Sequence, residues 1–220
     1  MTVQNTANSE GSGVTALTAV NIAKGLTVFC LFACVFLFGV RDMRQVIYLC
    51  LHISYGVWWQ LEQWIYPERR QMYGQKIGWL AFIYIIVSVG IFYALPGYLA
   101  FTNPEPLSLT AVTIALPLYI FGSLINTSAD VQKLTAKQFG AGLVRDNIWR
   151  FSRNINYFGD LVRYISFCVV AGSPWAYLVP GYIAIFYAVR MREKEQGMAG
   201  KYPEYGDYQK STARFIPFIW

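Results

Sequence analysis

The sequence predicts an all-α fold: a multi-pass bundle of about six transmembrane helices with a cytoplasmic C-terminal tail. Hydrophobic residues make up 55% of the 220 residues and charged residues only 14%, whereas a soluble domain carries roughly 25% charged residues. Long stretches lack any charge, and the aromatic content of 17% is typical of helices whose ends lie at a bilayer interface. This composition excludes a disordered chain, and it excludes nucleic acid as a main partner.

Each predicted span is an apolar stretch of about 20 residues, the length that crosses a bilayer. We expect spans at residues 18–40, 45–66, 77–100, 106–126, 157–172 and 175–190. The last two form a hairpin interrupted at Pro174, because proline lacks an amide donor and cannot continue a helix. The fifth span is short and contains Asp160 and Arg163, so we expect it to begin at the membrane surface. Residues 1–17 are rich in Ser, Thr, Asn and Gly and are predicted to be a disordered tail without a cleaved signal peptide.

The distribution of Lys and Arg predicts the orientation. These residues are concentrated in the segments 67–76, 127–155 and 190–220, which the positive-inside rule places in the cytoplasm. Arg41 and Arg44 fall on the far side, which leaves the direction of the first span open. We therefore expect an integral protein of a bacterial inner membrane or the endoplasmic reticulum, in contact with membrane lipids, with its C-terminus cytoplasmic.

The sequence contains no P-loop, HExxH or GxSxG motif, and no glycine-rich dinucleotide motif after a predicted strand. A cofactor site would therefore have to be built from membrane helices. No metal site is predicted, because the cysteines lie inside apolar stretches without CxxC spacing. These are Cys30, Cys34, Cys50 and Cys168.

Polar residues in the second span share one helix face. They are His52, Tyr55, Trp59, Glu62, Gln63 and Tyr66. A carboxylate within a span is costly and usually faces a cavity or a charged partner. Glu62 is therefore interpreted in two ways: as the partner of Arg69 or Arg70 at the cytoplasmic end, or as a proton donor or substrate-binding group in a lipid-facing cavity.

Two further regions are unusually polar. Asn126 and Asp130 are four residues apart and share a helix face, either as helix-end polarity or as hydrogen-bonding groups at the mouth of a cofactor pocket. The segments 150–160, 190–195 and 201–220 combine Arg, Asn, Tyr and acidic residues. They can converge on one site for a phosphate-bearing ligand, or form a basic, aromatic surface on anionic lipid headgroups.

The C-terminal pattern resembles a known membrane superfamily, which joins steroid 5-alpha-reductases, sterol reductases and isoprenylcysteine carboxyl methyltransferases. Residues 142–160 read GLVRDNIWRFSRNINYFGD and are similar to its GLxRYSRHPNYFGE motif. Residues 205–220 resemble its terminal YxxYxxxxxxxIPxxx pattern. The ADVQ at 129–132 and the YLVP at 177–180 are similar to a branch of uncharacterised bacterial 5-alpha-reductase-like proteins.

The resemblance implies an NADPH pocket that opens to the cytoplasm, built by residues 127–220, and a substrate cavity built by residues 18–126. The residues that it implies for the cofactor are Asn126, Asp130, Arg145, Arg153, Asn156, Asp160 and Tyr208. Gln60 and Glu62 are similar to the family's Gln–Glu pair that binds the substrate carbonyl, with one residue inserted.

Three functions follow as hypotheses. The first is NADPH-dependent reduction of an activated C=C bond in a steroid-like or other lipophilic small molecule. The second is a methyltransferase that uses S-adenosylmethionine on a lipid or prenylated carboxylate, because Arg190, Arg192, Glu193 and Glu195 resemble that branch's acidic pair. The third is a non-catalytic subunit of a membrane complex, because Asn154 and Ile155 replace the motif's His-Pro.

Overall fold

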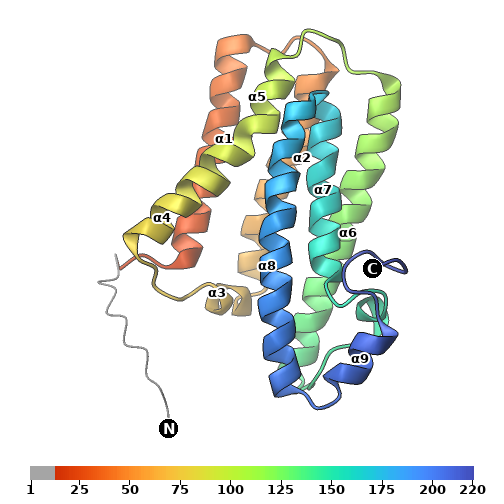
Figure 1. Ribbon diagram of the computed structural model, residues 1–220. Coiled ribbons are helices and arrows are strands. Elements are labelled where there is room, and N and C mark those ends of the chain that lie inside the picture. Colours follow the sequence, from red (N-terminus) through yellow and green to blue (C-terminus); the bar gives the residue numbers. More distant parts are fainter. Residues whose placement is uncertain (1–12) are drawn as a thin grey trace.

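The computed structural model describes residues 13–220, and within that range it contains helices and no strand (Figure 1). The predicted all-α fold is confirmed. Residues 1–12 of the predicted disordered tail (1–17) lie outside the described residues. The last residues of that tail, 13–17, are described and lead into the first helix. Thr15 caps the first helix by accepting a hydrogen bond from the Thr18 amide at 3.2 Å. The α-helices are α1 (Ala16–Phe38), α2 (Met43–Ile65), α3 (Glu68–Met72), α4 (Trp79–Ile85), α5 (Leu95–Thr102), α6 (Leu109–Gln138), α7 (Ile155–Ala171), α8 (Leu178–Lys201) and α9 (Tyr205–Ser211).

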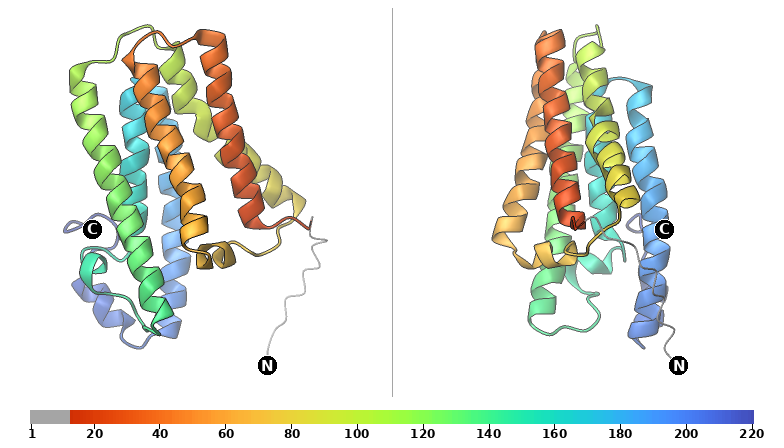
Figure 2. Two further views of the ribbon diagram at one scale, coloured as in Figure 1. Left: turned by 180° about the vertical axis from the view of Figure 1, so that it is seen from behind. Right: turned by 90° about the vertical axis from the view of Figure 1, so that its left-hand side faces the viewer.

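Every predicted span corresponds to a helical segment. Within the described residues, three of these segments are long and apolar enough to cross a membrane: Ala16–Phe38, Trp79–Thr102 and Leu109–Gln138. The count of six spans and the cytoplasmic C-terminus stay predictions. Helices α1, α2, α6, α7 and α8 run side by side, whereas α4 leans away from them (Figures 1 and 2).

The third segment bends because it is not one regular helix. A π-helical turn, η1 (Ile86–Ile91), and a 3₁₀ turn, η2 (Phe92–Ala94), join α4 to α5. The irregular turns leave backbone carbonyls without their usual helical partners. The buried Thr27 hydroxyl on α1 lies 2.8 Å from the Val89 oxygen and 3.0 Å from the Gly90 oxygen. This polar contact holds the bend against α1.

Helix α6 continues to Gln138, past the predicted span end at residue 126. Hydropathy falls after residue 126, but residues 127–138 contain neither Gly nor Pro, so nothing in them breaks a helix. The first part of the segment predicted as the loop 127–155 is therefore helical, and it extends α6 beyond the apolar part of the bundle. A 3₁₀ turn, η3 (Asn147–Arg150), follows before α7.

The core surrounds α7. Ten residues of this helix are buried, and Phe167 stacks on His52 of α2 with ring centroids 4.9 Å apart. His52 Nδ1 lies 3.2 Å from the Tyr48 hydroxyl, so His52 is engaged by side chains of the core. The interhelical packing of α7 sets the position of the polar groups at its first turns.

At the opposite end of the bundle, the buried Arg44 binds backbone carbonyls of two other segments. Its guanidinium donates to Val170 oxygen at 2.6 Å and to Glu105 oxygen at 2.9 and 3.1 Å. A positive charge on the predicted far side conflicts with the positive-inside rule. The Arg44 guanidinium joins α7 and the α5–α6 loop to α2.

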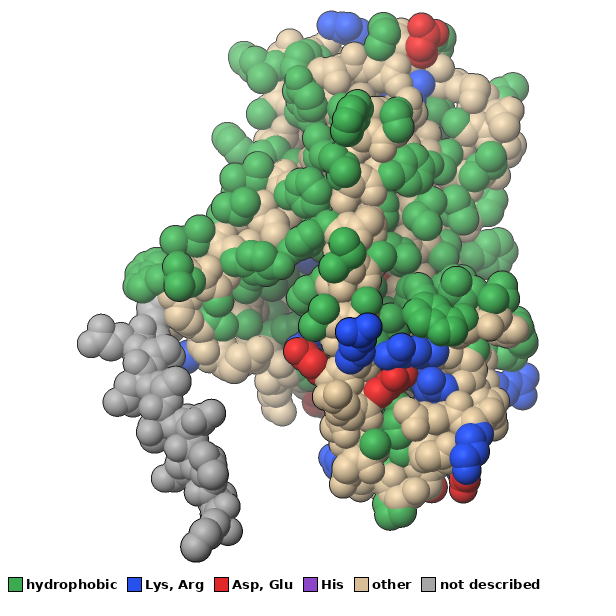
Figure 3. Space-filling model, viewed as in Figure 1, with side chains coloured by type: hydrophobic (Ala, Val, Ile, Leu, Met, Phe, Trp, Pro, Cys, Tyr) green, Lys and Arg blue, Asp and Glu red, His purple; other side chains and the backbone are tan. Residues whose placement is uncertain are grey.

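The outer surface has two zones. Hydrophobic side chains cover most of the upper part of the visible face, with a few charged side chains at its top edge, and Lys, Arg, Asp and Glu gather on the lower part, around α8 and α9 (Figure 3). The cysteines are free thiols, and no group of potential metal ligands exists among the described residues.

Candidate functional site

One arginine links the carboxylates of α2 and α6. Arg69 lies on α3, and its Nη2 is 3.3 Å from Glu62 Oε2 while its Nη1 is 3.2 Å from Asp130 Oδ2. The Glu62 and Arg69 side chains are only 5% and 13% exposed. Of the two interpretations of Glu62, the pairing with Arg69 is observed, but in a buried position and shared with Asp130.

The hydrogen-bonded chain continues from α6 to α7. Asn156 Nδ2 donates to Asp130 Oδ1 at 3.1 Å. Asn126 Nδ2 donates to the Asn156 backbone oxygen at 3.0 Å, and Arg163 Nη1 donates to Asn126 Oδ1 at 3.4 Å. The predicted i, i+4 pair on α6 therefore does face the predicted asparagine of α7.

The other end of the chain is the buried ion pair of Asp160 and Arg163. Asp160 also accepts a hydrogen bond from the Tyr187 hydroxyl of α8. The Arg163 guanidinium lies 4.2 Å from the centroid of the Tyr55 ring. Tyr55 in turn accepts a hydrogen bond from Lys24 of α1 at 2.7 Å. We call the whole connected set the polar network; it comprises Lys24, Tyr55, Glu62, Arg69, Asn126, Asp130, Asn156, Asp160, Arg163 and Tyr187.

Two buried atoms of the polar network have no hydrogen-bond partner in the structure. They are Asn156 Oδ1 and Arg163 Nε. Leaving a buried donor or acceptor without a partner costs about 1–3 kcal/mol. These two atoms could accept from and donate to a polar ligand.

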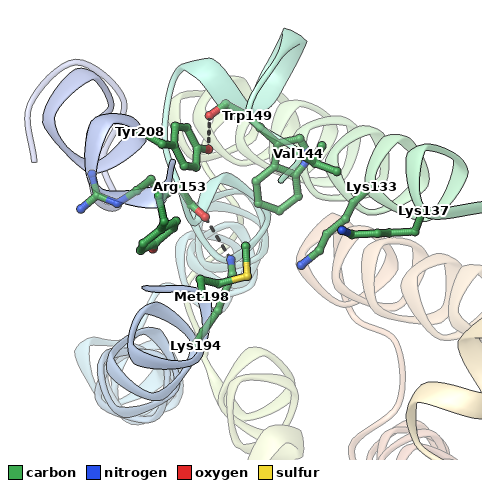
Figure 4. A pocket seen from close by; sticks show the side chains of 9 residues that line it. Lys133, Lys137, Val144, Trp149, Arg153, Lys194, Met198 and Tyr208 are labelled. Atoms are coloured by element: carbon green, nitrogen blue, oxygen red, sulfur yellow. Dashed lines mark hydrogen bonds between the residues drawn. The ribbon is translucent and has the colours of Figure 1, made fainter. Parts of the chain in front are cut away.

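A basic pocket lies next to the polar network, between α6, η3, α8 and α9 (Figure 4). The space inside it that can hold a water-sized molecule is about 40 Å³, and the pocket is partly open to solvent. Among the described residues, no carboxylate side chain lines it. Its lining residues are Lys133, Lys137, Val144, Trp149, Arg153, Lys194, Met198, Tyr205 and Tyr208. Such a donor set suits a phosphate group.

Lys194 is a half-buried cation of this pocket. Its Nζ lies 5.1 Å from the Trp149 ring centroid, and it donates to Arg153 oxygen at 3.0 Å and to Asn154 Oδ1 at 2.9 Å. Burial, assisted by the neighbouring charge of Lys133, lowers the pKa of Lys194 to about 7. The charge of the pocket therefore changes near neutral pH.

Arg153 and Tyr208 build the wall of the basic pocket. The Tyr208 hydroxyl donates to the Trp149 oxygen at 2.6 Å, and burial raises the pKa of Tyr208, so the phenol stays protonated. The Arg153 guanidinium points away from the lysines (Figure 4). It donates to Gln209 oxygen at 2.9 Å and lies 3.4 Å from Glu195. Both residues hold α8, α9 and η3 together around the pocket.

Two predicted site residues lie neither in the polar network nor in the basic pocket. Gln60 is exposed on α2, since residues two positions apart on a helix point in nearly opposite directions, and Glu62 faces inward. Arg145 is exposed in the loop before η3. The predicted pair of Gln60 and Glu62 therefore does not converge in this structure.

Several residues of the polar network and of the basic pocket are not among the predicted site residues. For Lys24 the signal was available, because it is the single charge between residues 18 and 40. Lys133 and Lys137 are spaced i, i+4, but their partner Lys194 is distant in sequence. The sequence predicts Arg69 only as a partner of Glu62, and its second contact to Asp130 depends on how α3 packs on α6.

Comparisons with known proteins agree with the resemblance in the sequence. Residues 6–212 match a family described as a protein of unknown function, DUF1295. The chain is 23% identical over 163 residues to a Delta(14)-sterol reductase of Arabidopsis thaliana, covering 66% of this chain and 44% of that protein. It is 25% identical over 209 residues to a probable 7-dehydrocholesterol reductase of Acanthamoeba polyphaga mimivirus, covering 83% of this chain and 46% of that protein. The chain thus spans under half the length of each of these relatives. The match to the uncharacterised bacterial branch stays a prediction.

Proposed function

The chain belongs to the DUF1295 family, which is steroid 5-alpha-reductase-like, and we propose that it is a membrane-embedded reductase of an activated C=C bond in a steroid-like or other lipophilic substrate, with NADPH as the reductant. One observation carries the proposal. Polar residues from α2, α6 and α7, far apart in sequence, form a single buried network beside a lysine-lined pocket. The sterol reductases among the relatives support the same reaction class.

The residues present fit the phosphate groups of NADPH. Lys133 and Lys194 offer ammonium groups to phosphates, in a pocket whose described lining has no carboxylate. The Lys137 ammonium already donates to the Ala141 oxygen at 3.0 Å and to the Tyr202 hydroxyl at 2.9 Å. The unpartnered Asn156 Oδ1 suits a donor such as a ribose hydroxyl or a carboxamide. When bound, the cofactor supplies a hydride. The protein then has to hold the substrate and stabilise the charge that develops on it.

Glu62 and Arg69 are proposed to stabilise the charge that develops on the substrate. A carboxyl group at Glu62 can share a proton with a substrate carbonyl oxygen. Arg69, 3.3 Å from Glu62, would stabilise the negative charge that develops on this oxygen during reduction. Asp130 keeps the guanidinium in place from the other side.

The methyltransferase alternative has less support from the contacts. Glu193 pairs with Arg190 at 3.0 Å, and Glu195 pairs with Arg214 at 3.1 Å and Arg153 at 3.4 Å. These acidic groups are therefore engaged by arginines of the chain itself.

Thermal unfolding in detergent with NADPH, NADH or S-adenosylmethionine tests the proposal. A ligand at a hundredfold excess over Kd stabilises the folded state by about 2.7 kcal/mol. We expect stabilisation by NADPH, weakened by about 1–3 kcal/mol in Asn156→Ala and in Asp130→Ala. Ser128→Ala, an exposed change on α6, is the matched control and should bind normally. Stabilisation by S-adenosylmethionine alone would support the methyltransferase, and no stabilisation by any of the three would support the non-catalytic subunit.

Turnover of a lipophilic enone tests the role of Glu62. Glu62→Gln keeps the shape and a hydrogen-bond donor, whereas Glu62→Ala removes both. We expect turnover to fall strongly in Glu62→Ala and less in Glu62→Gln, with NADPH binding intact in both. Near-normal turnover in Glu62→Ala would contradict this assignment.

A further inference from the structure

The segment 213–220 is docked on the residues that precede α7. Arg153 N donates to Ala213 oxygen at 2.9 Å, and Asn154 Nδ2 donates to Arg214 oxygen at 2.9 Å. The Ser152 hydroxyl donates to Phe215 oxygen at 2.9 Å. Ser152 and Asn154 are fully buried. The segment is therefore an ordered part of the fold.

Its last residues form a closed turn with apolar side chains on the outside. The Phe215 and Ile216 amides each donate to the Trp220 backbone oxygen at 2.6 Å. Phe218 adopts a φ of 65°, a left-handed conformation that is unusual for a bulky residue. Phe218 and Ile219 are 84% and 80% exposed. Transfer of such side chains from water to an apolar environment is favourable.

Cationic side chains lie beside these apolar ones. A groove is lined by Arg150, Phe151, Lys210, Ser211, Thr212, Ala213, Phe218 and Ile219. No carboxylate among residues 13–220 pairs with Arg150. Lys210 lies 3.4 Å from Asp207, but both side chains are 81% exposed, and such a surface pair contributes little. Both cations can therefore bind an anion in the groove.

The groove lies at the level where the apolar part of the bundle begins. Phe218 packs edge-on against Phe151 at 5.4 Å, and Phe215 packs against Phe158 in the first turn of α7 at 6.0 Å. That turn is also the start of the span predicted at 157–172. Figure 3 shows hydrophobic side chains and a group of Lys and Arg side by side in this lower part of the molecule.

We infer that this groove binds an anionic phospholipid of the surrounding leaflet. Arg150 and Lys210 hold the phosphate, and Phe218 and Ile219 contact the upper part of an acyl chain. A free phosphate would satisfy the cations but leave the two apolar side chains in water. The inference needs only a membrane position and is independent of the proposed reductase activity.

Lipid titration of the purified full chain tests the inference. Native mass spectrometry in detergent should show tighter binding of phosphatidylglycerol than of phosphatidylcholine. The double variant Arg150→Gln/Lys210→Gln should raise the apparent Kd for phosphatidylglycerol about 25-fold, since each Lys or Arg near an anionic lipid contributes about a fivefold factor. Lys76→Gln/Lys201→Gln removes the same charge at exposed positions elsewhere and should keep wild-type affinity. Equal loss in both double variants, or competition by inorganic phosphate at the same concentration as the lipid, would overturn the inference.

A spin label reports the depth of the turn without relying on lipid affinity. The label is placed at Ile219→Cys, or at Gln209→Cys on α9 as the matched exposed control, after the native cysteines are replaced by alanine. In anionic nanodiscs, the label at residue 219 should collide more with oxygen than with a water-soluble nickel complex, and the label at residue 209 should show the reverse. Equal nickel accessibility at both positions would place the turn in water and contradict the inference.

Discussion

Gly122 on α6 and Gly159 on α7 are in direct backbone contact. A Cβ on Gly159 would lie 2.7 Å from the Asn126 amide nitrogen and 2.8 Å from the Gly122 oxygen. Small residues allow membrane helices to approach this closely. Asn126 and Asp130 lie one and two helical turns after Gly122 on α6, and Asn156 lies about one turn before Gly159 on α7. The same approach brings both α6 residues within hydrogen-bond distance of Asn156.

Replacing Gly159 by alanine should separate α6 from α7. The added methyl group would meet backbone atoms, which cannot move independently, and such overpacking costs about 1–3 kcal/mol. We expect a lower free energy of unfolding and weaker ligand binding at the polar network. Thermal unfolding in detergent measures the first effect. Gly181→Ala on α8 is the control, because a Cβ added there would meet no atom within 4 Å, and a wild-type stability of Gly159→Ala would refute the contact.

Removing Arg69 should destabilise the protein more than removing Arg70. Arg69→Met leaves the buried Glu62 and the half-buried Asp130 without their shared cation, and breaking a buried ion pair in this way costs about 3–5 kcal/mol. Arg70 is exposed and makes a single hydrogen bond, from its Nε to the Gln63 oxygen at 2.8 Å. Chemical unfolding of both variants in mixed micelles compares the two losses. Equal stability of Arg69→Met and Arg70→Met would mean that the observed pairing contributes little.

The contacts of Arg44 with the Val170 and Glu105 oxygens, at the opposite end of the bundle, should depend on its planar guanidinium. Arg44→Lys keeps the charge but cannot bind the Val170 and Glu105 oxygens together, so we expect clear destabilisation. Gly172→Ala should have a similar effect, because Gly172 has a φ of 65° and an added Cβ would lie 2.2 Å from Arg44 Nη1. Arg41→Lys is the exposed control. Unchanged melting temperatures in Arg44→Lys and Gly172→Ala would show that the Arg44 contacts do not contribute to stability.

The pH dependence of stability should reveal Lys194. Its pKa of about 7 in the folded state lies below the ordinary lysine value of 10.5, so above pH 7 the unfolded chain holds more protons than the folded one. By linkage, the contribution of Lys194 to the free energy of unfolding rises as the pH increases from about 7 toward 10.5. The stability difference between wild type and Lys194→Met should therefore shift in favour of wild type over this range.

Unfolding curves from pH 6 to pH 9 measure that shift, and Lys201→Met at an exposed site should show none. Binding of a phosphate-bearing ligand should have the opposite trend, since the pocket loses positive charge as Lys194 deprotonates. If the difference in free energy of unfolding between wild type and Lys194→Met does not change with pH, the lowered pKa of Lys194 is contradicted.

Local properties of the sequence determined the helices and part of the site. Apolar composition and span-length stretches predicted every long helix, because burial in lipid requires each segment to satisfy its own backbone hydrogen bonds. The i, i+4 spacing of Asn126 and Asp130 put both on one face, since helical periodicity is a local property. The sequence also offers the pairing of Glu62 with Arg69 as one of two interpretations, because the two residues are close together in the chain.

Contacts between helices were decided only by the tertiary structure. Apolar helix surfaces pack with little directional preference, so the sequence does not state which faces meet. The glycine contact of α6 and α7 sets the register that joins Asp130 to Asn156, and the packing of α8 brings Lys194 to Lys133 across more than 60 residues of chain. The outward direction of Gln60 likewise follows from which face of α2 the neighbouring helices bury. Side-chain partners distant in sequence depend on this three-dimensional packing, because their geometry is fixed only when the helices are assembled.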